Sequence, residues 1–389
     1  MTTIKKTHSN NRVHTHSAKA NDLSQTHFPC KQCGADLIYS PEQQQLVCEY
    51  CGFQNPIPVS DQKIKVYDFK STLNKLKQLQ HKQKNTSISI IQCPSCAAEF
   101  TLKEEFSANC PFCGTPVVTS TEHARFIQPE SLLPFIITNK EAIDAFNQWV
   151  RNLWFAPSQL KKISRQNEKL TGIYLPYWAY DSDTKSNYQG ERGIVYYEPE
   201  VYYTVIDGRR IRQERSVAKV RWTTVSGHVS LFFNDILIGA SKTLPRNIID
   251  SLEPWDLENL KPYSKAYLSG FHSELYQISI DQAYLQAKNI MDRRINYAVR
   301  RDIGGDRQRI FSINTRYDNT TFKHLLLPVY SAAFKYRGQT YRYVVNGRTG
   351  KIHGERPYSF IKILFAIIMI LIIASGIFYF LEKSGALKP

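Results

Sequence analysis

The cysteine pairs Cys30-Lys-Gln-Cys33 and Cys48-Glu-Tyr-Cys51 decide how the first part of this chain folds. A second set, Cys93-Pro-Ser-Cys96 and Cys110-Pro-Phe-Cys113, repeats the arrangement further along. The pairs are separated by 14 residues in the first set and by 13 in the second. Each pair predicts a tight turn, or knuckle, that directs two thiolates at one metal ion. Two knuckles on adjacent hairpins give the four-sulfur tetrahedral geometry that zinc favours.

Glycine directly follows three of the four pairs, at Gly34, Gly52 and Gly114, where a residue that tolerates positive φ suits a tight turn. Between the two cysteine pairs of the second set, residues 99–103 and 106–108 are expected to pair with each other as a hairpin. The sequence therefore predicts two four-cysteine zinc ribbons, at residues 28–55 and 91–120, with one structural Zn²⁺ ion in each. The predicted metal ligands are Cys30, Cys33, Cys48, Cys51, Cys93, Cys96, Cys110 and Cys113.

Disulfide bonds and an iron–sulfur centre are the alternatives for eight cysteines in this pattern. A reducing compartment disfavours disulfides, and the orientation derived below places the cysteines in the cytoplasm. A four-thiolate site leaves no open coordination position on the metal, so we expect both sites to be structural and not catalytic.

The other end of the chain carries an apolar run. Ile363–Leu381 contains no charged residue, and these 19 residues reach roughly 28 Å as a helix, close to the thickness of a hydrocarbon core. A transmembrane helix is predicted at 361–381, with a short tail at 382–389. Basic residues are more frequent before this helix than after it, which predicts a tail-anchored, single-pass protein of the cytoplasmic (inner) membrane with its N-terminal bulk in the cytoplasm.

The segments around the ribbons are polar and basic. Residues 1–27 predict a disordered polar tail. Residues 56–90 form a basic linker in which Leu73, Leu76 and Leu79 recur at helical spacing. A solvated linker is one interpretation of this charge, and a contact for anionic lipid head groups or nucleic acid is the other.

Residues 125–357 predict an α+β cytoplasmic domain with antiparallel sheets. Thr138, with Glu141 three residues later, is a capping box that starts a helix. From residue 170 to 238 the pattern is that of strands, with a hairpin turn at Asp207-Gly208. A long helix is expected from residue 279 or 281 to 302. Strands close the domain, one of them expected to break at Pro328.

No catalytic or cofactor-binding residue is recognisable, so we expect a protein that is not an enzyme. Gly350-Lys351 is followed by Ile352 where a Walker A loop needs Ser or Thr, and no Gly-x-Ser-x-Gly or His-Glu-x-x-His motif occurs. The 389 residues carry a formal net charge of +16, which is compatible with anionic membranes or nucleic acid as partners.

Further motifs carry a resemblance. These are the two cysteine sets, Leu175-Pro-Tyr-Trp-Ala-Tyr-Asp181, Pro254-Trp-Asp-Leu257, Tyr267-Leu-Ser-Gly-Phe271, Asp302–Gln308, Thr321–Pro328 and Val345–Ser359. Together they resemble a family of bacterial zinc-ribbon membrane proteins often labelled primosomal protein N′ (replication factor Y) or superfamily II helicase. The resemblance extends over residues 28–380 and implies an adaptor without a helicase motor. It also implies association with flotillin-like and phage-shock-type proteins.

Three hypotheses follow. The first is a membrane-tethered zinc-ribbon scaffold that binds protein partners. The second is a membrane-tethered DNA-binding protein linked to replication, because the net charge and arginine-rich strands permit phosphate contacts. The third is an enzyme whose site the sequence does not reveal.

Overall fold

The computed structural model describes residues 28–58, 63–82, 90–92, 99–101, 105–109, 116–118, 127–157, 170–206, 208–337 and 339–383. The predicted tail at 1–27 and the second set of cysteines, Cys93, Cys96, Cys110 and Cys113, lie outside these residues. The fold is mixed, with helices and antiparallel sheets as predicted, and strands make up most of it.

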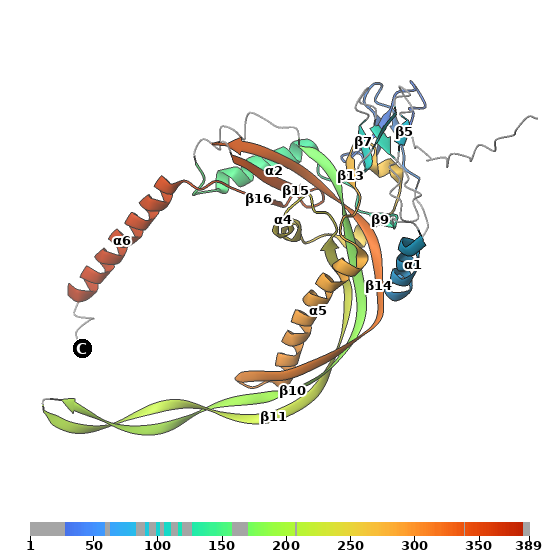
Figure 1. Cartoon of the computed structure of the whole chain (residues 1–389). Coiled ribbons are helices and arrows are strands. Elements are labelled where there is room, and N and C mark those ends of the chain that lie inside the picture. Colours follow the sequence, from blue (N-terminus) through green and yellow to red (C-terminus); the bar gives the residue numbers. More distant parts are fainter. Residues whose placement is uncertain are drawn as a thin grey trace, which may run out of the picture.

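Three very long strands form the centre of the molecule (Figure 1). They are β10 (Thr171–Ile206), β11 (Arg209–Gly239) and β14 (Arg307–Tyr336). β10 lies between the other two and is antiparallel to both. β10 and β11 form the hairpin predicted at this point, and Gly208 in its turn takes a φ of +75°, in the left-handed region that glycine tolerates.

Strands of 30 residues or more are far longer than the usual three to ten, and irregularities allow this sheet to twist and curve. The pairing of β10 with β14 shifts register between Gln189 and Gly190. A Cβ atom at Gly190 would lie 2.3 Å from the carbonyl oxygen of Arg309, so only glycine permits this close approach.

The break expected at Pro328 is wrong, because β14 continues through it opposite Tyr174 of β10. On its other side, β14 pairs with β9 at Leu325 and Leu326 and with β15 from Val329 onward. Pro328 thus stands where the outer neighbour changes, a position where a missing N–H costs no ladder hydrogen bond.

The shorter strands surround this centre. They are β1 (Leu37–Ser40), β2 (Gln45–Cys48), β3 (Gln54–Asn55), β4 (Tyr67–Asp68), β5 (Ile90–Gln92), β6 (Glu99–Thr101), β7 (Glu105–Asn109), β8 (Pro116–Val118), β9 (Ser131–Leu132), β12 (Lys261–Pro262), β13 (His272–Glu274), β15 (Gln339–Asn346) and β16 (Ile352–Gly354). The expected pairing of 99–103 with 106–108 is wrong: β6 pairs with β5, and β7 pairs with β8 and β13. The local hairpins therefore bracket each cysteine pair instead of joining the two pairs.

The helices are α1 (Phe69–Lys82), α2 (Asn139–Asn152), α4 (Arg246–Ser251), α5 (Ile280–Ile303) and α6 (Phe360–Lys383), with 3-10 turns at Leu257–Asn259 and Lys265–Leu268. The capping box of Thr138 and Glu141 at the start of α2 is confirmed. The long helix is confirmed as α5, which ends where Gly304 takes a φ of +66°. Its buried stripe of Ala283, Ala287 and Met291 packs in one cluster with Trp178, Tyr180 and Phe322 of the central sheet.

β14 begins at Arg307, which pairs with Gly193 of β10. Beyond Gly193, β10 therefore pairs with β11 alone. We call residues 194–206 and 209–221 the β-arm. It leaves the lower end of the body in Figure 1 and extends well past α5. α6 begins at the upper end of the body, close to α2 (Figure 1).

Within α6, the 22 residues Phe360–Leu381 have a mean hydropathy of 2.8, and none of the most apolar stretch is buried against the rest of the chain. By length and composition this helix can cross a membrane, in agreement with the predicted span.

Candidate metal centre

The four cysteines of the first set meet at one point. The Sγ atoms of Cys30 and Cys51 are 3.5 Å apart, as are those of Cys33 and Cys48, and all four lie within 4.8 Å of one another. Cys30 and Cys48 are buried, whereas Cys33 and Cys51 are exposed. This predicted ligand set is therefore confirmed as a group that can hold a metal ion.

Each cysteine pair stands on the same kind of turn. The amide of Gly34 donates to the carbonyl of Cys30, and that of Gly52 donates to the carbonyl of Cys48, both at 2.9 Å. The two glycines have φ values of +76° and +73°, as the predicted knuckles require. β2 pairs with β1 on one side and β3 on the other, which fixes the two turns relative to each other.

The spacing of the sulfurs suits a metal and not a disulfide. Four thiolates about 2.3 Å from a tetrahedral zinc would be separated by about 3.8 Å. A disulfide needs about 2.05 Å, and all four described cysteines are free thiols. The observed 3.5 Å separations agree with the metal geometry.

The surroundings of Cys30 make its thiol easier to ionise to a thiolate. Desolvation opposes its ionisation, but the backbone N–H groups of Cys33 and Gln32 and the neighbouring thiols outweigh this and lower the pKa of Cys30 to about 7. The amide of Gln32 points at the Cys30 sulfur from 3.4 Å. Backbone amides directed at the sulfurs commonly orient and stabilise the thiolates of sulfur–metal sites.

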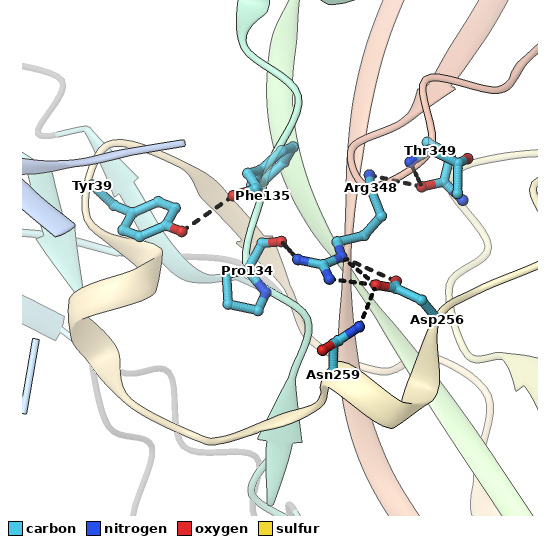
Figure 2. A network of polar contacts seen from close by, with 8 residues as sticks. Tyr39, Pro134, Phe135, Asp256, Asn259, Arg348 and Thr349 are labelled. Atoms are coloured by element: carbon cyan, nitrogen blue, oxygen red, sulfur yellow. Dashed lines mark hydrogen bonds and ion pairs between the residues drawn. The ribbon is translucent and has the colours of Figure 1, made fainter. Parts of the chain in front are cut away.

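The ribbon around this site is fixed to the body. Tyr39 of β1, which is only 2% exposed, donates its hydroxyl to the carbonyl of Phe135 at 3.1 Å (Figure 2). The Ser269 hydroxyl donates to the carbonyl of Leu37 at 2.7 Å, and the Tyr39 amide donates to the carbonyl of Ser269. Cys30, Cys48 and Tyr39 also share one hydrophobic cluster with residues of α2, β10 and β14.

A half-buried ion pair lies next to this contact, with the Arg348 side chain buried and the Asp256 side chain 37% exposed. The guanidinium of Arg348 makes a forked contact with Asp256 and donates to the carbonyl of Pro134 at 3.2 Å (Figure 2). Desolvation raises the pKa of Asp256, but the hydrogen bonds and charge of Arg348 outweigh it and the pKa is lowered. Pro134 and Phe135 thus link the ribbon on one side to this ion pair on the other.

The sequence did not indicate Tyr39, Ser269 or Arg348 as parts of the site. The cysteine spacing specifies the ligands and says nothing about what the ribbon packs on. The structure buries Leu37 and Tyr39 alternately with half-exposed Ile38 and Ser40, but the sequence Leu-Ile-Tyr-Ser does not alternate in polarity and so did not indicate which side is covered. For the second set of cysteines, the described strands β5, β6, β7 and β8 bracket the predicted ligands, which themselves lie outside the described residues.

Comparison with known proteins shows a distant similarity. Over 337 residues the chain is 24% identical to "Uncharacterized protein YdjG" of Bacillus subtilis (strain 168), and the match covers 85% of this chain and 90% of that protein. No family model matches the chain, and no solved structure matches it.

Proposed function

We propose that this protein is a membrane-anchored zinc-ribbon adaptor that binds protein partners at the cytoplasmic face of the membrane without catalysing a reaction. The observation that carries the proposal is the four-cysteine site, whose ribbon is packed into the core of the body. Four thiolates fill the coordination of a tetrahedral ion and leave no position for water or substrate, which supports a structural role.

Zinc is the proposed metal at this site and at a second site formed by Cys93, Cys96, Cys110 and Cys113. Metal analysis of the purified chain should give two zinc ions, and Cys48→Ser should leave one. A metal-free protein with eight reactive thiols would contradict the proposal.

The β-arm supports partner binding. In β10, one side of the arm carries Val195, Tyr197, Pro199, Val201, Tyr203 and Val205, and we call this side the apolar face of the arm. Toward the tip, β11 adds Glu214, Arg212 and Arg210 to the same side. The exposed fractions of Tyr197, Tyr203 and Val205 are 68%, 56% and 69%. An isolated two-stranded ribbon is marginally stable in water, and exposed apolar patches mark interaction sites. A partner that covers this face would bury the apolar side chains that are exposed on the β-arm.

Neighbouring residues allow a sharp test. A photo-crosslinking residue at Tyr197 lies on the apolar face, and one at Tyr196 lies on the opposite face as a matched control. In native membranes we expect one reproducible protein adduct from position 197 and much less of it from position 196. This adduct should be lost when Val201 and Val205 are changed to Ser. Equal labelling from both positions would contradict the proposed docking face.

The resemblance to zinc-ribbon membrane proteins of the primosomal protein N′ label supports the same proposal. It suggests flotillin-like or phage-shock-type proteins as partners. The basic residues before α6 support an N-terminal bulk in the cytoplasm. Release of the chain from membranes by carbonate would contradict the proposed anchor.

The second candidate function is DNA binding, which the arm also favours, since a two-stranded β-ribbon fits the major groove. Its cations are partly neutralised, however. Arg215 pairs with Glu200 at 2.6 Å, and Lys219 pairs with Glu198. Sub-micromolar DNA binding with a steep salt dependence would favour this candidate, and its absence at physiological salt would favour the adaptor.

A further inference from the structure

A groove of about 860 Å³ lies where the body meets α6. Leu153, Trp154 and Phe155 form one wall, directly after α2. The other wall is the first part of α6, with Phe365, Met369 and Ile370. The volume is in the range of sites that bind small molecules.

Hydrogen bonds join the two walls of the groove. The ammonium of Lys362 donates to the carbonyls of Trp154 at 3.4 Å and Ala156 at 2.8 Å, and the Ser359 amide donates to the Phe155 carbonyl at 2.7 Å. These bonds fix the loop after α2 to the start of the candidate transmembrane helix. The loop and the helix therefore meet at the depth where a membrane surface would lie.

The side chains around the groove are those of a membrane interface. Trp154 is 80% exposed, Phe360 is 78% exposed, and Tyr358 stands two residues before Phe360. Aromatic residues concentrate at membrane–water boundaries, where their rings lie at the level of the head groups. In water, these exposed aromatic side chains would be unfavourable.

Charge is distributed unequally along the groove. Arg151 and Lys362 line it near the surface, and among the described residues neither forms an ion pair. The Nε of Arg151 donates to the carbonyl of Asn147, which leaves the outer guanidinium nitrogens for a ligand. Toward the membrane the lining is apolar. An occupant must therefore carry negative charge at one end and hydrocarbon at the other.

We propose that this groove binds one anionic glycerophospholipid, with its phosphate between Arg151 and Lys362 and an acyl chain along Phe365, Met369 and Ile370. The inference rests on the proposed membrane anchor. It goes further because it assigns a specific site to one lipid molecule. A transmembrane helix alone would require only the surrounding bilayer. A bound lipid would also hold the body in one orientation on the bilayer.

The test uses the full-length chain in nanodiscs of equal parts phosphatidylcholine and phosphatidylglycerol, followed by transfer to mild detergent and native mass spectrometry. Wild type should retain one phosphatidylglycerol. Arg151→Gln should retain it about fivefold less, the effect of one cation near an anionic surface. Arg151→Lys should restore most of the retention. Lys140→Gln, an exposed change at the other end of α2, should match wild type.

Trp154 gives an independent measurement. Brominated phosphatidylglycerol should quench tryptophan fluorescence in wild type, and Trp154→Phe should remove most of this quenching, whereas Trp255→Phe, in the core, should not. Equal retention by wild type and Arg151→Gln, or a copurified polypeptide in place of the lipid, would overturn the lipid site. If carbonate releases every variant from membranes, the anchor itself is wrong, so the two failures are distinguishable.

Discussion

Acid should destabilise this protein through one buried histidine, His324 of β14. Its side chain is fully buried, with its ring 4.7 Å from that of Trp178 and 5.4 Å from that of Tyr276. Nδ1 lies 2.7 Å from the carbonyl oxygen of Ile127, so Nδ1 carries the proton and the ring is neutral. Burial lowers the pKa of His324 to about 4.

The sign and size of the effect follow from this pKa. In the unfolded chain a histidine has a pKa of about 6.5, so below that pH the unfolded state binds a proton that the folded state does not. Full stability is present above pH 6.5 and is lost as the pH falls towards 4. Between pH 7 and pH 4 the free energy of unfolding should fall by about 3 kcal/mol because of this residue alone.

The assay is urea unfolding of the full-length chain in detergent at pH 7, 5.5 and 4, with tryptophan fluorescence as the signal. His324→Asn keeps a donor near the position of Nδ1 but does not titrate. Taking the difference between the two proteins cancels the carboxylates and the cysteines, which are common to both. Wild type should lose about 3 kcal/mol more than His324→Asn, and His228→Asn should follow wild type. Parallel pH profiles for wild type and His324→Asn would refute the reasoning.

Two further substitutions test the contacts around the ribbon. Tyr39→Phe should lower the free energy of unfolding by about 1 kcal/mol, and Tyr39→Ala should lower it by about 3–5 kcal/mol. The zinc content of both variants should stay that of wild type, because Tyr39 anchors the ribbon and not the metal. Loss of zinc in either variant would contradict this role. Arg348→Met should lower the free energy of unfolding by about 1–3 kcal/mol, because it removes the partner of an Asp256 carboxylate that stays 37% exposed to water. Adding Asp256→Leu should recover part of the loss in the same denaturation assay. A double variant no more stable than Arg348→Met alone would count against the ion pair as the cause.

The sequence predicted the features that local patterns specify. The capping box of Thr138 lies at the helix start it sets, and the long helix expected to end at residue 302 ends at Ile303. Cys30, Cys33, Cys48 and Cys51 are near neighbours in sequence, so their spacing alone indicated a common site. The apolar run of α6 needed only length and composition.

Features that depend on distant residues could not be predicted in this way. The length of β14, and that of β10 as far as Gly193, follows from the pairing of these two strands, which joins Thr171 to Ser331. Pro328 gives the signal of a strand end, yet the change of neighbour from β9 to β15 makes proline acceptable there. The contact of Tyr39 with Phe135 spans 96 residues, and no local pattern in either segment indicates the other.

The pairing of β10 with β14 has a consequence for biosynthesis. β10 and β11 are joined by a tight turn and can form their hairpin as soon as both have left the ribosome. The partner on the other side of β10 is made only after α5 has been synthesised, so the edge of β10 stays unpaired during that interval. Such an edge invites association with other nascent chains, and sheets built from distant segments form slowly. Production of this protein should therefore depend on chaperone capacity more than its final stability would suggest.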